Sequence, residues 1–205
     1  MSRLKFLERI LTLLKNPNNP SFGLSRDNTH LKGIFSLVID GEDFGQLTRL
    51  YIVDRKIEPF AVQLHTHRYP IILTTIKGEI LHHEAKPILN TNEEGIQLSE
   101  FEYRSPLNKG NGLTYAKESK VKLNEYRIPH FAKVHISEFE FHTVSCSEDS
   151  IWIIQEQGFK TEFNRVLGVP FETENLYDVP SKETVKKYAK RVIKEIELII
   201  NAFRK

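Results

Sequence analysis

The middle of the chain is built from short runs of apolar and β-branched residues, many of which alternate with polar ones. Between residues 33 and 160 the clearest runs lie at 34–39, 50–53, 60–64, 71–76, 134–136 and 151–154. Turn-forming residues separate several of these runs, at 40–41, 77–78, 108–112 and 148–149. Many short strands divided by turns predict a sandwich or barrel, and the lack of strands alternating with long helices disfavours a parallel sheet.

The two ends of the chain have a helical period instead. In the first segment apolar residues recur every three or four positions, at Leu4, Leu7, Ile10, Leu11 and Leu14. Asn and Pro residues at 16–20 end that segment. Near the other end, Ser181 is a suitable N-cap for a second stripe, formed by Val185, Tyr188, Ala189, Val192, Ile196, Ile199 and Ile200. We expect both amphipathic helices to pack on their own barrel, although the second stripe also suits a dimer contact.

These patterns predict three parts: an N-terminal helix in 1–20, a barrel in 21–165, and a linker with a C-terminal helix in 166–205. The composition of the 205 residues is that of an ordinary globular protein, with 40% hydrophobic and 27% charged residues. A net charge of +2 gives no strong field for nucleic acid or an anionic membrane, so neither is an expected partner.

Residues 1–15 are apolar enough to suggest a signal peptide, but Glu8 and Arg9 interrupt them and no small-residue cleavage site follows. No stretch approaches the roughly 20 apolar residues that span a bilayer. The single cysteine, Cys146, excludes an intrachain disulfide and a cysteine-rich zinc site, and it fits a reducing compartment. We therefore expect a cytoplasmic protein in which Cys146 and Trp152 are core residues.

Two of the eight histidines, His65 and His67, stand out by their spacing. Residues two apart on a strand point to the same face, so a strand here would carry both imidazoles, with Gln63, on the face opposite Leu64. Two imidazoles side by side can bind one metal ion, and a third ligand has to come from another strand. The spacing alone is a weak signal, and surface histidines on an edge strand are the alternative.

The segment around this pair resembles the first motif of the cupin superfamily, G-x5-H-x-H-x3/4-E-x6-G. His65, His67 and Gly78 match that motif at suitable spacing, and a weaker match to the second motif places His142 just before a β-rich run. The resemblance implies a mainly β fold, the double-stranded β-helix or jelly roll. It also implies a metal ion held by His65, His67 and a third histidine, for which we expect His142.

The departures from the cupin motifs bear on the ligand set. Ile71 or Ile72 stands where the family has a glutamate ligand, Glu58-Pro59 replaces the first glycine, and the second motif lacks its glycines. Three neutral imidazoles suit Fe(II), Zn, Ni or Cu. Because some cupin dioxygenases have a three-histidine iron site, the resemblance makes Fe(II) the expected metal, with Zn, Ni and Cu as alternatives.

Several other side chains are further candidates for the metal site or for the pocket around it. His135 and His130 are alternatives for the third ligand, each nearer to the turn at 128–129. Glu140 is either a fourth ligand, a proton acceptor or an exposed carboxylate, and Gln63 and Tyr69 would line a pocket. The adjacent His82 and His83 face opposite sides of a strand, and we expect one to be exposed and one partly buried.

The favoured hypothesis is a metal-dependent cupin enzyme, a non-haem Fe(II) dioxygenase or oxygenase acting on a small molecule, with no catalytic residue assigned. The alternatives are a non-enzymatic cupin that serves binding or assembly, and a sugar isomerase or epimerase that would use His67 and Tyr69 as acid and base. A homodimer formed through the sheet edges is also open, as is a monomer whose terminal helices cover those edges.

Overall fold

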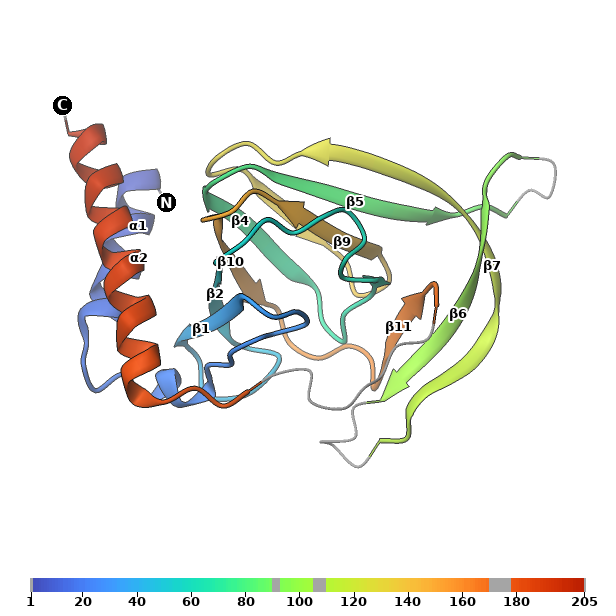
Figure 1. The fold of residues 1–205 in the computed structure, drawn as a ribbon, viewed down its shortest axis with the longest axis horizontal. Helices are drawn as coiled ribbons and strands as arrows, with labels where there is room; N and C mark the ends of the chain where they lie inside the picture. The colour runs from blue at the N-terminus through green and yellow to red at the C-terminus, as the bar shows by residue number, and fades with distance from the viewer. Residues whose placement is uncertain (1, 90–92, 105–109, 170–177, 205) are drawn as a thin grey trace.

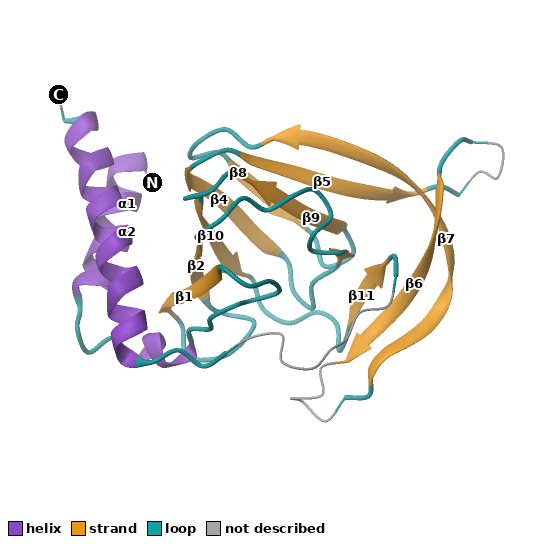
Figure 2. Cartoon of the chain, viewed as in Figure 1, coloured by secondary structure: helices purple, strands orange, loops and turns teal. Residues whose placement is uncertain are grey.

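The computed structural model describes residues 2–89, 93–104, 110–169 and 178–204 as two antiparallel sheets and two long helices (Figures 1 and 2). The elements in chain order are α1 (Arg3–Lys15), the 3-10 helix η1 (Pro20–Leu24), β1 (Ile34–Asp40), β2 (Thr48–Val53), β3 (Leu64–His65), β4 (Ile71–Lys77), β5 (Ile80–Pro87), β6 (Ile96–Arg104), β7 (Gly112–Arg127), β8 (Lys133–Ile136), β9 (Phe141–Cys146), β10 (Ile151–Glu156), β11 (Asn164–Leu167) and α2 (Lys182–Phe203).

The strand order is that of a jelly roll. The first sheet has the order β1-β2-β10-β4-β8, and the second has the order β11-β3-β9-β5-β7-β6 and closes where β11 pairs with β6. Along the chain, β2 to β5 alternate between the two sheets, and so do β8 to β10. This alternation makes two four-stranded layers, β2-β10-β4-β8 and β3-β9-β5-β7, wound together. The predicted double-stranded β-helix is therefore confirmed.

Both predicted helices form, and they lie side by side on one side of the β-structure, beside β1 (Figure 1). Ser2 caps α1, and the Ser181 hydroxyl caps α2 by accepting from the Thr184 N–H. Their apolar stripes share one core with the outer face of the first sheet, including Phe35, Leu50 and Ile153. The stripes are thus covered by their own chain. No helix in the described part of the chain is both long and apolar enough to cross a membrane.

A second core fills the space between the two sheets. Val53, Leu73 and Trp152 enter it from the first sheet, and Ile80 and Cys146 enter it from the second. Trp152 is stacked on Tyr51, with ring centroids 5.3 Å apart. As predicted, Trp152 and Cys146 are core residues, with 4% and 5% of their surfaces exposed.

Most predicted strands form, but the run at 60–64 does not. Its strand is reduced to Leu64–His65, and Phe60 has a left-handed backbone (φ 61°) and is exposed. The chain pairs with β9 at Ile57 and again at His65, and the residues between bulge out of the ladder. Pro59 has no N–H to give to that ladder, which is a physical reason for the break. The predicted turn at 108–112 lies partly outside the described residues.

The turn between β4 and β5 requires Gly78. Its backbone has a φ of +86°, and a Cβ atom there would lie 2.1 Å from the Ser150 Oγ and 2.8 Å from the Ser150 Cα. We expect Gly78→Ala to lower the free energy of unfolding by about 1–3 kcal/mol, because both the left-handed backbone and the clash oppose a side chain. Urea unfolding followed by circular dichroism measures the loss. Gly23→Ala is the control, since nothing lies within 4 Å of its Cβ position.

Candidate metal centre

Strand pairing brings the three predicted histidines together. His65 on β3 is the register partner of His142 on β9, and side chains of such pairs stand next to each other on one face. His67 follows two residues later, beyond the end of β3, and its ring centroid lies 5.0 Å from each of the other two. One ligand nitrogen from each histidine lies within 4.8 Å of the others.

The cluster faces the space between the sheets. His142 shares a face of β9 with Val144 and Cys146, which pack in the core shared with the first sheet. Of the three rings, His142 is buried, while His65 and His67 are half-buried. The two alternative third ligands lie elsewhere: His130 is exposed and bonded to the Gly78 carbonyl, and His135 is exposed on β8 of the first sheet.

The donor set fits a divalent metal ion. Burial lowers the pKa of all three imidazoles, and the neighbouring histidines lower those of His67 and His142 further, to well below 6.5. The rings are therefore neutral at physiological pH, as metal ligands must be. The Nε2 atoms of His67 and His142 lie 2.7 Å apart. Two nitrogens bound at about 2.0–2.1 Å to one ion stand roughly 3.0–3.4 Å apart, so a small outward rotation of the rings would admit the ion.

Backbone contacts already orient one of these rings for coordination. The His65 Nδ1 lies 2.8 Å from the Gln63 carbonyl oxygen, so it is the protonated nitrogen and leaves Nε2 free for a metal. The Gln63 side chain, in contrast, donates to the Val169 carbonyl.

His30 was not among the predicted residues. Its backbone is left-handed (φ 66°), and its ring centroid lies 5.6 Å from that of His65.

No carboxylate joins this group among the residues that the structure describes. Ile71, one of the two residues expected at the position of the cupin glutamate, is buried in the apolar core between the sheets. Glu140 lies closer to a different histidine, since its Oε1 is 3.9 Å from the His82 Nε2. The cluster therefore consists of three imidazoles.

The expectation for His82 and His83 was wrong, because both are buried, with 0% and 2% of their surfaces exposed. Side chains cover both faces of β5 at this point, with Phe60 on the ring of His83 and with Tyr126 and His142 on the ring of His82. His83 lies 2.8 Å from the Ser145 hydroxyl and packs against Phe60. His82 points the other way, toward His142. The sequence did hold a signal, since His82 shares a strand face with the apolar Ile80.

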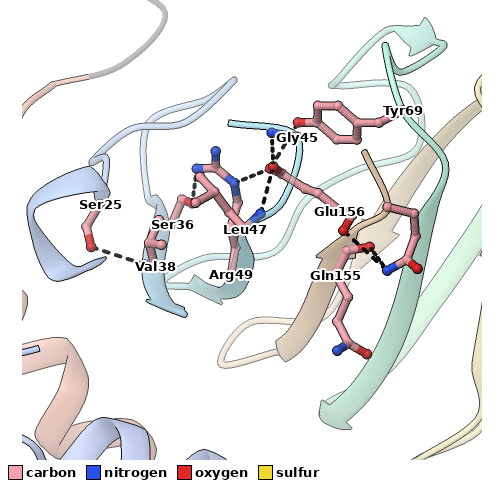
Figure 3. A network of polar contacts seen from close by, with 10 residues as sticks. Ser25, Ser36, Val38, Gly45, Leu47, Arg49, Tyr69, Gln155 and Glu156 are labelled. Atoms are coloured by element: carbon pink, nitrogen blue, oxygen red, sulfur yellow. Dashed lines mark hydrogen bonds and ion pairs between the residues drawn. The ribbon is translucent and has the colours of Figure 1, made fainter. Parts of the chain in front are cut away.

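A buried polar network lies on the first sheet (Figure 3). Glu156, at the end of β10, accepts four hydrogen bonds. The Arg49 Nε (2.7 Å) and the Tyr69 hydroxyl (3.0 Å) donate to its Oε1, and the backbone N–H groups of Gly45 (2.6 Å) and Leu47 (3.1 Å) donate to its Oε2. Arg49 and Glu156 are 7% and 6% exposed, so this is a desolvated ion pair whose charges are balanced inside the barrel.

Tyr69 connects this network to the histidine cluster. Its ring is stacked on that of His67 with a centroid distance of 6.0 Å. Burial and the Glu156 carboxylate both raise the pKa of Tyr69, so the phenol remains a hydrogen-bond donor. Tyr69 was predicted to line the site, whereas Arg49 and Glu156 were not predicted. Single charged residues within strands normally indicate a solvent-facing side.

The known proteins that match this chain are solved structures. No protein-family model and no curated protein matches it. The hydroxypropylphosphonic acid epoxidase from S. wedmorenis is 10% identical, with a TM-score of 0.37 over 62% of this chain and 52% of that one. The β-barrel nucleoside dehydratase Pac13 is 13% identical, with a TM-score of 0.37 over 73% of this chain and 88% of that one.

A third solved structure is the hydroquinone 1,2-dioxygenase PnpCD in complex with Cd2+ and 4-hydroxybenzonitrile. It is 10% identical, with a TM-score of 0.32 over 60% of this chain and 62% of that one. The chain thus spans about half the length of the epoxidase and under two thirds of the dioxygenase. TM-scores this low carry no conclusion about the activity of this chain.

Proposed function

We propose that this chain is a metal-dependent enzyme of the cupin fold, in which His65, His67 and His142 bind one divalent ion. The observation that carries the proposal is the meeting of three neutral imidazoles, within 4.8 Å of one another, on the inner side of a jelly roll. Fe(II) is the expected metal and oxygenation of a small molecule is the expected reaction. Zn, Ni and Cu are compatible with the same ligands.

A metal ion bound by three side chains would supply open coordination positions at which a small molecule and O2 can be activated. The protein residues around it have separate tasks. The Gln63 carbonyl orients the ring of His65. Trp152 and Tyr51 form a stacked apolar wall between the sheets, which keeps water from that part of the interior. The Tyr69 hydroxyl stays bonded to Glu156 and holds its ring beside His67.

The sugar isomerase alternative is less well supported by this geometry. It would need the Tyr69 phenol to exchange a proton with substrate. That hydroxyl already donates a hydrogen bond to the buried Glu156 carboxylate, and the raised pKa of Tyr69 makes it a poor acid. A non-enzymatic cupin that serves binding or assembly remains the second alternative, and it is distinguished by its lack of turnover.

Metal analysis is the first test of the proposal. Protein purified without chelator, or reconstituted with Fe(II) under nitrogen, is expected to hold close to one ion per chain by inductively coupled plasma mass spectrometry. Fewer than about 0.1 ion per chain, with no gain after adding Fe(II), would contradict the metal site. Oxygen uptake by the iron-loaded protein, screened against a panel of small thiols, phenols and organic acids, then separates an oxygenase from a binding module.

A further inference from the structure

A fourth imidazole lies directly behind the three-histidine cluster. His82 on β5 is the register partner of Val144 on β9, and its side chain is completely buried. Its Nε2 lies 3.2 Å from the Nδ1 of His142, and the two rings are stacked with centroids 5.1 Å apart. His82 is thus in hydrogen-bonding contact with the nitrogen of His142 that faces away from His67.

The two nitrogens of His142 have different surroundings, and this decides their roles. Its Nε2 faces the His67 Nε2 and is the atom available to a shared metal ion. If Nε2 binds the ion, the ring proton must be on Nδ1, and the acceptor within reach is the His82 Nε2. The Glu140 carboxylate is 3.9 Å from that same His82 nitrogen, which is too far for a hydrogen bond.

This arrangement leaves an unsatisfied group on the far side of His82. Once its Nε2 accepts from His142, its own proton is on Nδ1, which is buried and has no hydrogen-bond partner among the described residues. A buried N–H without an acceptor is unfavourable, and an apolar side chain of the same shape would avoid it. An apolar residue at position 82 would therefore favour folding more than His82 does. This indicates that the Nε2 of His82 has a role other than stabilising the fold.

We propose that His82 is a positioning residue of the metal centre: its Nε2 accepts a hydrogen bond from the Nδ1–H of His142 and so fixes that ring for coordination through its own Nε2. The inference rests on the proposed function, since it concerns the ligand His142. Such outer contacts typically change metal affinity by about 10–100-fold, because they hold the ring orientation and raise the basicity of the ligand.

Two substitutions of His82, one without a hydrogen-bond acceptor and one with an acceptor near the position of Nε2, test this role. His82→Leu removes the acceptor, and His82→Gln places an amide oxygen near the position of Nε2. The affinity for Co(II), measured by competition with a chromophoric chelator, is expected to fall about 10–100-fold in the Leu variant and to remain within a few-fold in the Gln variant. The visible absorption spectrum of bound Co(II) is expected to change in the Leu variant and to be retained in the Gln variant.

His83→Leu is the matched control. It removes the neighbouring imidazole, equally buried but on the opposite face and bonded to Ser145, so it weakens the fold without touching the cluster. Its Co(II) affinity and spectrum are expected to equal those of the unmodified protein. Should the Leu variant of His82 fail to fold, His82→Asn replaces it, because the shorter amide ends near Nδ1 and cannot reach His142.

The outcomes separate this inference from the function on which it rests. If the unmodified protein binds no Co(II), the metal site itself fails. If the unmodified protein binds Co(II) and the folded Leu or Asn variant binds it equally well with the same spectrum, only the role of His82 is overturned. Loss of affinity in the Gln variant as large as in the Leu variant would also overturn it, since the acceptor would then not be what matters.

Discussion

Glu156→Ala is expected to lower the free energy of unfolding by about 3–5 kcal/mol, the usual loss when one partner of a buried ion pair is removed. The substitution would leave the Arg49 guanidinium charged inside the barrel without its counter-ion. It would also remove the acceptor of the Gly45 and Leu47 N–H groups and of the Tyr69 hydroxyl. Urea unfolding, followed by the fluorescence of the single tryptophan, gives the difference.

Two companion variants show whether the buried charge is the cause. Glu58→Ala breaks the Lys56–Glu58 pair, whose side chains are 66% and 64% exposed, and should change stability by less than about 1 kcal/mol. The double variant Arg49→Met/Glu156→Met removes both charges and should recover part of the loss seen in Glu156→Ala. A loss below about 1 kcal/mol for Glu156→Ala would mean that water reaches this pair and that the network is not desolvated.

The apolar strands and both helices could be predicted because their apolar side chains lie in a core. β1, β4 and β10 have buried residues on both faces and are rich in Ile and Leu, and α2 buries a stripe of helical period. β7 has no such signal. Most of the side chains of Gly112–Arg127 are exposed or half-buried, and the strand is held mainly by backbone pairing with β5 and β6. Backbone hydrogen bonds leave no period in the sequence, so pattern reasoning does not detect such strands.

The candidate site was predictable to the extent that its residues are local. His65 and His67 are two positions apart in the sequence, so their rings lie close together even though β3 ends at His65 and His67 follows it. His82, Arg49 and Glu156 depend on which face of β5, β2 and β10 is turned inward. A slip of one residue in register exchanges the two faces of a strand. The sequence pattern therefore does not determine which face is turned inward, and the pairing of the strands in the barrel does.

His142→Ala is expected to lower the affinity for divalent metal by more than about 100-fold, beyond the usual effect of a residue that only supports a ligand. It removes one of three ligands. The two remaining imidazoles, His65 and His67, belong to one short segment, and no carboxylate of the described residues joins them. The loss is measured by titrating the apo-protein with Zn(II) or Co(II) against a chromophoric chelator. A ligand that binds only the folded state also raises the melting temperature, so the metal-induced shift should disappear in this variant.

His135→Ala is the control for that experiment, because it removes an exposed imidazole on the first sheet, away from the cluster. Its metal affinity and metal-induced thermal shift should match those of the unmodified protein. If the two variants lose affinity equally, the ion is bound by surface histidines and the barrel cluster is not its site. If His142→Ala alone loses it, the three imidazoles act as one centre, because the ion needs a ligand from β9 as well as the two from the segment after β3.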